Sequence, residues 1–109
     1  MLQDFRVENE IDRDGNPTGG WAKAVGLSLV WQDGPLGRGV TRAEPNGAFV
    51  ETIIAITKQR IEFYQTAAAG KFACRENAIA ITKLDEALLW LDKRTRDREA
   101  RGVEGTHTA

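Results

Sequence analysis

Arginine side chains near the end of a predicted long helix are the groups of this chain best suited to bind an anion. Arg94 and Arg98 continue a spacing of alternating three and four residues, so we expect both to face inward or toward a subunit interface. A guanidinium group keeps its charge and matches two oxygens of a carboxylate or a phosphate. The two arginines therefore predict either a site for a small phosphorylated ligand or an intersubunit salt bridge, and the sequence leaves both open.

The start of the same predicted helix offers a second set of binding groups. Arg75 and Asn77 lie beside the backbone N–H groups that a helix N-terminus leaves free for an anion. Asn77 also carries an amide that can pair with an adenine edge, and Tyr64 or Phe63 offers a ring face on which a base can stack. Each residue alone is explained as well by capping or core packing. Together with the arginines, they predict a nucleotide pocket.

Groups for catalysis or metal binding are scarce in this sequence. The chain has one histidine, His107, and one cysteine, Cys74, so a zinc site or a Cys/His nucleophile pair lacks ligands or a base. The neighbouring carboxylates Asp85 and Glu86 fit a solvated helix face. We expect a binding protein rather than an enzyme, with no metal and no cofactor.

The composition limits the size of the fold and the class of partner. A chain of 109 residues with 41% hydrophobic residues suffices for one domain with a modest core. The net charge of −1 gives no reason to expect a DNA or RNA polymer as partner. No apolar run approaches the ~20 residues of a membrane helix, and a lone cysteine fits a reducing compartment. We therefore expect a soluble, cytoplasmic protein.

Strands are predicted in the N-terminal part of the chain, residues 1–45. Apolar and polar residues alternate within residues 4–11 and, more regularly, from Val25 to Trp31, which is the spacing of half-buried strands. Turn residues lie between these segments, at Asp14-Gly15-Asn16-Pro17 and at Gly19-Gly20. Further glycines and prolines from Gly34 to Pro45 predict a loop.

Helical spacing replaces this alternation in the remainder of the chain. It predicts a first helix over residues 46–66, with Asn46 as its N-cap, and a second helix over residues 72–102. A small-residue connection joins the two helices, and Gly102 is placed to end the second with a left-handed cap. Residues 103–109 form a tail.

These elements predict a single α+β domain over residues 1–109, in which a small N-terminal antiparallel sheet precedes a long two-helix hairpin. The second helix is apolar on more than one side, which requires more neighbours than one hairpin and a small sheet provide. We therefore expect a homo-oligomer. The seam that would face a partner helix has alternating steps of three and four residues: Asn77, Ala80, Leu84, Ala87, Leu91, Arg94 and Arg98.

The C-terminal third of the chain also carries a long specific motif. It comprises Phe72-Ala73-Cys74-Arg75-Glu76-Asn77-Ala78, then Ala80-Ile81-Thr82-Lys83-Leu84-Asp85-Glu86-Ala87-Leu88, Trp90-Leu91, Arg94-Thr95 and Arg101-Gly102-Val103-Glu104-Gly105-Thr106-His107. With looser matches at Val30-Trp31-Gln32-Asp33-Gly34-Pro35, Asn46-Gly47 and Phe63-Tyr64-Gln65, it resembles the Thoeris anti-defence sponge family of phage proteins. The helical hairpin of that family is shared with phage anti-CBASS cyclic-nucleotide sponges.

This resemblance implies a protein that binds and sequesters a cyclic ADP-ribose isomer made by a bacterial TIR enzyme, without degrading it. Bacterial Thoeris immunity is thereby blocked in the cytoplasm of the infected host cell. Some members also hold cyclic dinucleotides or trinucleotides at separate sites and assemble as hexamers. The alternatives are an enzyme that degrades the cyclic nucleotide signal and a structural helical oligomer without a ligand.

By motif position, the resemblance assigns base stacking to Tyr64 and pocket contacts to Asn77 and Arg94, with Arg42 as a further ligand-binding residue from the preceding loop. A second cyclic-nucleotide site is assigned to Arg75, Arg98, Gly105 and Thr106. The sequence departs from the family pattern in two places. A tyrosine stands at position 64, where phenylalanine is commoner, and residues 67–69 form an apparent insertion at the hairpin corner, which bears on ligand preference.

Overall fold

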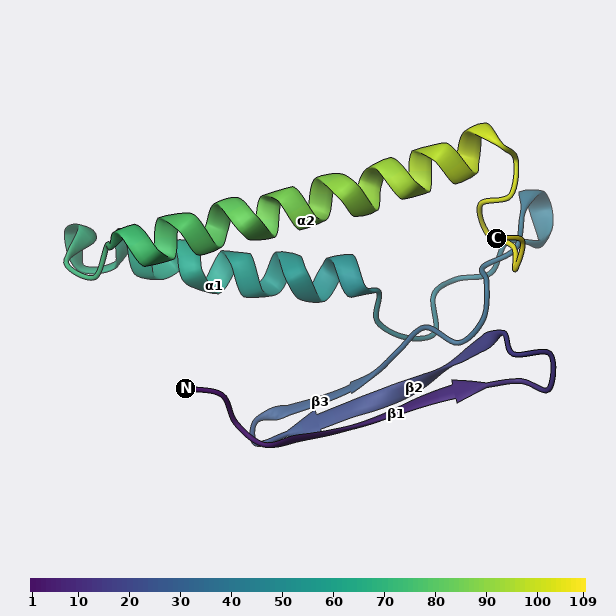
Figure 1. Ribbon diagram of the computed structural model, residues 1–109, viewed down its shortest axis with the longest axis horizontal. Helices are drawn as coiled ribbons and strands as arrows, with labels where there is room; N and C mark the ends of the chain where they lie inside the picture. Colours follow the sequence, from purple (N-terminus) through teal and green to yellow (C-terminus); the bar gives the residue numbers. More distant parts are fainter. The chain divides into compact units, whose positions relative to one another are not determined.

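The computed structural model describes residues 1–109, and the chain divides into two compact units, one with a sheet and one with a helical hairpin (Figure 1). The first unit joins residues 1–49 to residues 98–109, and the second comprises residues 50–97. The predicted α+β fold class is confirmed. Neither helix combines the length and the apolar composition that crossing a bilayer demands.

The sheet of the first unit has three antiparallel strands in the order β1 (Phe5–Ile11), β2 (Pro17–Ala24) and β3 (Leu27–Val30). The outer strands fall in the two segments with alternating apolar residues. The chain turns at residues 13–15, which overlap the predicted turn residues, whereas Gly19 and Gly20 are wrongly predicted as turn residues, because both belong to the central strand. Gly20 is the one fully buried residue, and a Cβ there would overlap the Glu8 carbonyl group on β1. Close approach of two strands therefore requires this glycine.

After β3 the chain forms a loop whose two ends are tied together. Gln32 donates its backbone N–H to the Ala48 carbonyl over 2.9 Å, and the Asn46 backbone N–H donates to the Gln32 side-chain oxygen over 2.9 Å. The Asn46 side-chain oxygen accepts from the Asp33 backbone N–H at 2.8 Å. The predicted N-cap role of Asn46 is therefore wrong, since its side chain closes the loop and α1 begins at Val50.

The second unit is a hairpin of two antiparallel helices, α1 (Val50–Gly70) and α2 (Arg75–Ala100) (Figure 1). An ion pair joins them at mid-length, with the Lys58 Nζ 2.6 Å from an Asp85 carboxylate oxygen. Helical backbone angles end at Ala67, and Ala68 and Ala69 have positive φ values of 51° and 57°. The corner is therefore a tight non-helical turn.

The end of α2 has the predicted left-handed cap. Gly102 has a φ of 72° and donates its N–H to the Glu99 carbonyl over 3.0 Å, while Val103 donates to the Arg98 carbonyl over 3.0 Å. These two bonds form a Schellman motif, which satisfies carbonyl groups that the last helical turn would otherwise leave free.

The packing face of α2 follows the predicted seam as far as Leu91 and then departs from it. The half-buried stripe continues through Thr95 and Arg98, whereas Arg94 is exposed. Arg94 therefore does not face the interior of one copy of the chain, and its place at a subunit interface stays a prediction. No side chain is fully buried anywhere in the structure. Large apolar side chains stay between 40% and 70% exposed on the two helices, namely Val50, Ile56, Phe63, Tyr64, Ile79, Leu89 and Trp90.

Candidate functional site

The hairpin corner brings Tyr64 and Asn77 to the same end of the second unit. The Gln65 side chain reaches across the corner, where its oxygen accepts from the Cys74 N–H at 2.9 Å and its Nε2 donates to the Cys74 carbonyl at 3.1 Å. Tyr64 precedes this amide clamp by one residue on α1, and Asn77 follows it by three residues on α2. Tyr64, with the predicted stacking role, and Asn77, with the predicted edge-reading role, therefore lie on either side of the Gln65–Cys74 hydrogen bonds in the chain.

Tyr64 presents a partly exposed ring beside a cation. The residue is 42% exposed, and its hydroxyl oxygen accepts a hydrogen bond from Arg60 Nη2 at 3.2 Å. The Arg60 Cζ lies 5.0 Å from the centre of the Tyr64 ring and 5.3 Å from the centre of the Phe63 ring. The two rings meet edge to face, with their centres 5.8 Å apart. The corner therefore combines a stacking surface with a positive charge.

Asn77 lies in the first turn of α2 with its side chain half-buried and its amide group unused. Its backbone N–H points to the sulfur of Cys74, 3.5 Å away, and no protein group bonds to its side-chain amide. The amide nitrogen and oxygen are therefore available together to a planar group with a complementary edge, such as a nucleobase.

Arg94 lies near the opposite end of α2. It is exposed and has no salt bridge, whereas Arg96 pairs with Asp92 at 2.9 Å. Arg94 follows Asn77 by 17 positions on one continuous helix, a distance of about 25 Å at the helical rise. One copy of the chain therefore does not bring these two predicted residues to the same small ligand.

Arg42, the remaining predicted pocket residue, is held by a carboxylate of the tail within the first unit. It follows the 3-10 helix η1 (Gly39–Thr41), and its two terminal nitrogens lie 2.7 and 2.9 Å from the two carboxylate oxygens of Glu104. The hydrogen bonds from Arg42 hold the pKa of Glu104 below its ordinary value, and the same bonds raise the pKa of Arg42. An external anion at Arg42 would have to share or displace this partner.

Arg98, Gly105 and Thr106 come together in the tail, but as structural partners. The Arg98 guanidinium donates to the backbone carbonyls of Val103, Thr106 and Thr108 over 3.1, 3.0 and 2.6 Å. Gly105 accepts a hydrogen bond from the Gly37 N–H at 2.9 Å, and a Cβ at this glycine would overlap the Gly37 carbonyl oxygen. Arg98 therefore holds the tail in its folded path.

The residues of the predicted second cyclic-nucleotide site lie far apart, with Arg75 at one end of α2 and the others at the opposite end or beyond it. Arg75 is the first residue of the helix, is exposed and makes no ion pair. It lies 23 residues before Arg98, or about 35 Å along the axis. A site that used both arginines would need them from two copies of the chain.

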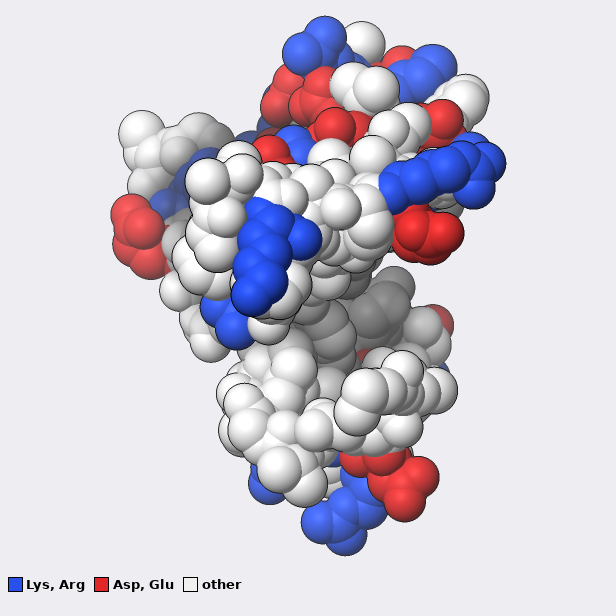
Figure 2. Space-filling model, turned by 90° about the vertical axis from the view of Figure 1, so that its left-hand side faces the viewer, with Lys and Arg blue, Asp and Glu red and all other residues white.

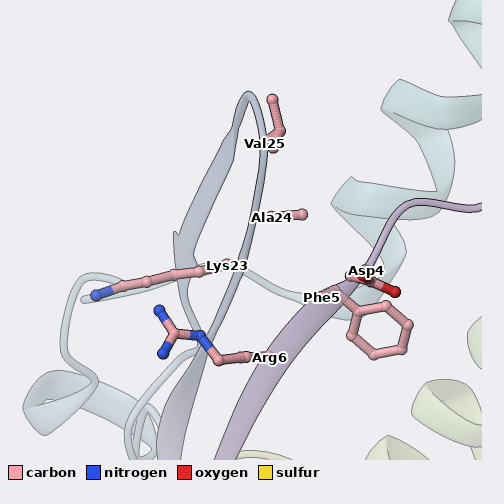
Figure 3. Close-up of a pocket in the computed structure, with 6 residues that line it drawn as sticks. All are labelled: Asp4, Phe5, Arg6, Lys23, Ala24 and Val25. Atoms are coloured by element: carbon pink, nitrogen blue, oxygen red, sulfur yellow. The ribbon is translucent and has the colours of Figure 1, made fainter.

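The remaining surface offers weaker candidates. No group of three or more His, Cys, Asp or Glu side chains has the arrangement of a metal site. On the face drawn in Figure 2, basic and acidic side chains are interspersed, and no continuous basic area suits a polymeric anion. A shallow hollow at one end of the sheet is lined by Phe5, Ala24 and the cross-strand neighbours Arg6 and Lys23, together with Asp4 and Val25 (Figure 3). This hollow is open and carries no side chain with the predicted roles.

Three residues around the candidate sites were missed from the sequence. The spacing of four residues between Arg60 and Tyr64 is a local signal that could have identified Arg60. Gln65 and Glu104 act over longer separations, and Glu104 is 62 residues from its partner, so no periodic pattern pointed to it. Arg60 bonds to the Tyr64 hydroxyl group and Glu104 to Arg42, whereas Gln65 joins the two helices through the Cys74 backbone.

Two comparisons with known proteins bear on the same residues. Residues 30–96 match the family described as the Acb2/Tad1 hairpin domain. A curated relative, "Thoeris anti-defense 1" of Bacillus phage SBSphiJ7, is 54% identical over 68 residues, which are 62% of this chain and 46% of the relative. The chain therefore spans about half the length of that relative. The family match includes Arg42, Tyr64, Asn77 and Arg94 and covers more than half of the chain. This protein therefore belongs to the Acb2/Tad1 hairpin family.

Proposed function

We propose that this chain is an anti-defence sponge that binds and sequesters a cyclic ADP-ribose isomer and so blocks bacterial Thoeris immunity. The observation that carries the proposal is the hairpin corner, where the exposed Tyr64 ring and the unbonded Asn77 amide flank the Gln65 clamp. Family membership and the name of the phage relative support the same role. The mechanism is stoichiometric, because tight binding lowers the free concentration of the signal without any chemical step.

Assembly belongs to the same proposal. Apolar side chains remain exposed on both helices, which favours a homo-oligomer, and the family resemblance suggests a hexamer. Asn77 and Arg94 lie about 25 Å apart on one helix, so a pocket containing both would take them from neighbouring copies. The same reasoning applies to a separate cyclic dinucleotide or trinucleotide site with Arg75, Arg98, Gly105 and Thr106.

The experiment that tests the proposal identifies a bound ligand by mass. The purified protein is incubated with cyclic ADP-ribose isomers and cyclic oligonucleotides, washed, and heated to release what it retained. We expect an unmodified cyclic ADP-ribose isomer. A hydrolysed or linearised product would instead indicate the degrading enzyme. Release of nothing, together with an unchanged melting temperature for every compound, would favour the structural oligomer, because a ligand that binds only the folded state must stabilise it.

Variants at the corner then separate binding from folding. Asn77→Trp should block the pocket sterically, and Tyr64→Ala should cost about 1–3 kcal/mol of base stacking. Both variants should keep the size-exclusion profile of the parent protein, because neither side chain is fully buried and the Asn77 amide makes no hydrogen bond in the ligand-free chain. Full retention of the ligand by Asn77→Trp would show that the pocket lies elsewhere.

A further inference from the structure

Arg60 is a cation of the hairpin that no carboxylate neutralises. Two residues earlier on the same helix, Lys58 pairs with Asp85 at 2.6 Å, whereas Arg60 makes no salt bridge. Its one hydrogen bond, to the Tyr64 hydroxyl group, uses one of the five N–H donors of a guanidinium. The other donors are free for an acceptor that is not part of this chain.

Two aromatic rings fix the position of this cation without cancelling its charge. The Arg60 Cζ lies 5.0 Å from the Tyr64 ring centre and 5.3 Å from that of Phe63. A cation over an aromatic face is attracted by the ring quadrupole and remains a full positive charge. Because Arg60 precedes Phe63 by three residues and Tyr64 by four, one turn of α1 sets the arrangement.

We propose that Arg60 is a further ligand-binding residue, whose guanidinium contacts a phosphate oxygen of the nucleotide whose base stacks on Tyr64. This inference rests on the proposed function. A nucleotide presents a flat base and an anionic phosphate joined by a sugar, and the corner presents a ring and a cation joined by one helical turn. Because the guanidinium lies over the Tyr64 ring and bonds to its hydroxyl group, the proposal places the base on the opposite face of the ring.

Other cations of the hairpin are less suited to this contact. Lys58 is already neutralised by Asp85, and Lys83 lies 3.8 Å from a Glu86 carboxylate oxygen. Lys71 and Arg75 at the corner make no salt bridge, but Lys71 lies over the Phe72 ring and neither has a hydrogen bond or a cation–ring contact with Tyr64. A guanidinium can also bind two phosphate oxygens at once, which an ammonium group cannot do with the same geometry. Arg60 is therefore the hairpin cation that combines free donors with direct contact to the predicted stacking residue.

A positioning role is the alternative, in which Arg60 would only hold the Tyr64 ring through its hydroxyl group. Tyr64→Phe separates the two roles, because it removes the hydroxyl group and keeps the ring. If Arg60 contacts the ligand, Arg60→Ala should weaken binding roughly ten- to a hundredfold, while Tyr64→Phe should change it by less than about threefold. Arg60→Lys should recover part of the loss, since it keeps the charge.

The experiment measures affinity by calorimetry, with the linkage isomers of cyclic ADP-ribose as probes, at low and at high salt. The advantage of the parent protein over Arg60→Ala should shrink as salt rises, because a charge–charge contact is screened. Arg96→Ala, which removes an exposed arginine paired with Asp92, is the matched control and should bind normally. Size-exclusion profiles and melting temperatures verify that each variant folds.

Two outcomes would overturn this inference alone. One is an Arg60→Ala variant that binds as tightly as the parent protein, and the other is a Tyr64→Phe variant that loses as much affinity as Arg60→Ala. If the parent protein binds none of the isomers, the proposed function fails, and the role of Arg60 fails with it.

Discussion

Gln65 closes the hairpin corner, and its replacement should loosen the corner while both helices stay formed. Its side chain makes two hydrogen bonds to the backbone of Cys74, with lengths of 2.9 and 3.1 Å. A hydrogen bond contributes a net of about 0.5–1.5 kcal/mol, and water can replace part of each bond at this exposed position, so Gln65→Ala should cost about 1–2 kcal/mol. This loss raises the open fraction of the corner roughly 5- to 30-fold.

Hydrogen exchange at the Cys74 amide measures this opening directly, because that N–H group is the donor to Gln65. NMR at fixed pH and fixed protein concentration should show faster exchange in Gln65→Ala by roughly the same 5- to 30-fold factor. Gln59→Ala is the control, since Gln59 is exposed on the same helix and its side chain makes no hydrogen bond. Equal Cys74 exchange rates in Gln65→Ala and the parent protein would refute the clamp.

Three further predictions concern the arginine-rich end of α2 and the tail. Arg94→Ala should weaken ligand binding roughly ten- to a hundredfold and Arg96→Ala should not, so equal affinities in calorimetry would remove Arg94 from the site. The hydrogen bonds from Arg42 lower the pKa of Glu104 in the folded chain, and Glu104 is ionised at neutral pH in both the folded and the unfolded chain. Its contribution to tail docking should therefore be complete above the ordinary pKa of 4.5. This contribution should disappear as the pH falls through the lower pKa of the folded state. The NMR shift of the Gly105 amide should follow that transition, and Glu104→Gln should abolish it. Gly105→Ala should release the tail, which would be seen as faster exchange of the Gly37 N–H group that donates to the Gly105 carbonyl. Gly15 has a similar φ of 83° but open space around it, so Gly15→Ala should strain only its own turn.

Much of the fold follows from local patterns in the sequence. Alternating residues identified both outer strands, and the change to helical spacing identified both helices, because each pattern depends on neighbours within one or two turns. Gly20 misled the prediction, because a glycine needed for close strand contact has the same sequence signal as a glycine in a turn. Asn46 misled it because a side-chain amide can close a loop as readily as it caps a helix.

The candidate site was only partly accessible from the sequence. Tyr64 and Asn77 are 13 residues apart, and a short corner between antiparallel helices is enough to bring them to one end. Arg42 and Glu104 meet across 62 residues, which no local rule predicts. Arg98 shows a further difficulty, because its guanidinium is used by backbone carbonyls, and the sequence does not distinguish that use from binding of a ligand.

The hydrogen bonds between Gln65 and Cys74 also make the register of the two helices independent of the length of the corner. Since Gln65 and Cys74 are joined directly, residues 66–73 can be lengthened, shortened or exchanged without changing which turns of α1 and α2 face each other. The left-handed Ala68 and Ala69 show that this segment tolerates unfavourable backbone conformations of about 1–2 kcal/mol each. Natural variation or directed evolution could therefore change the rim around Tyr64 and Asn77, and with it the choice of ligand, on an unchanged scaffold.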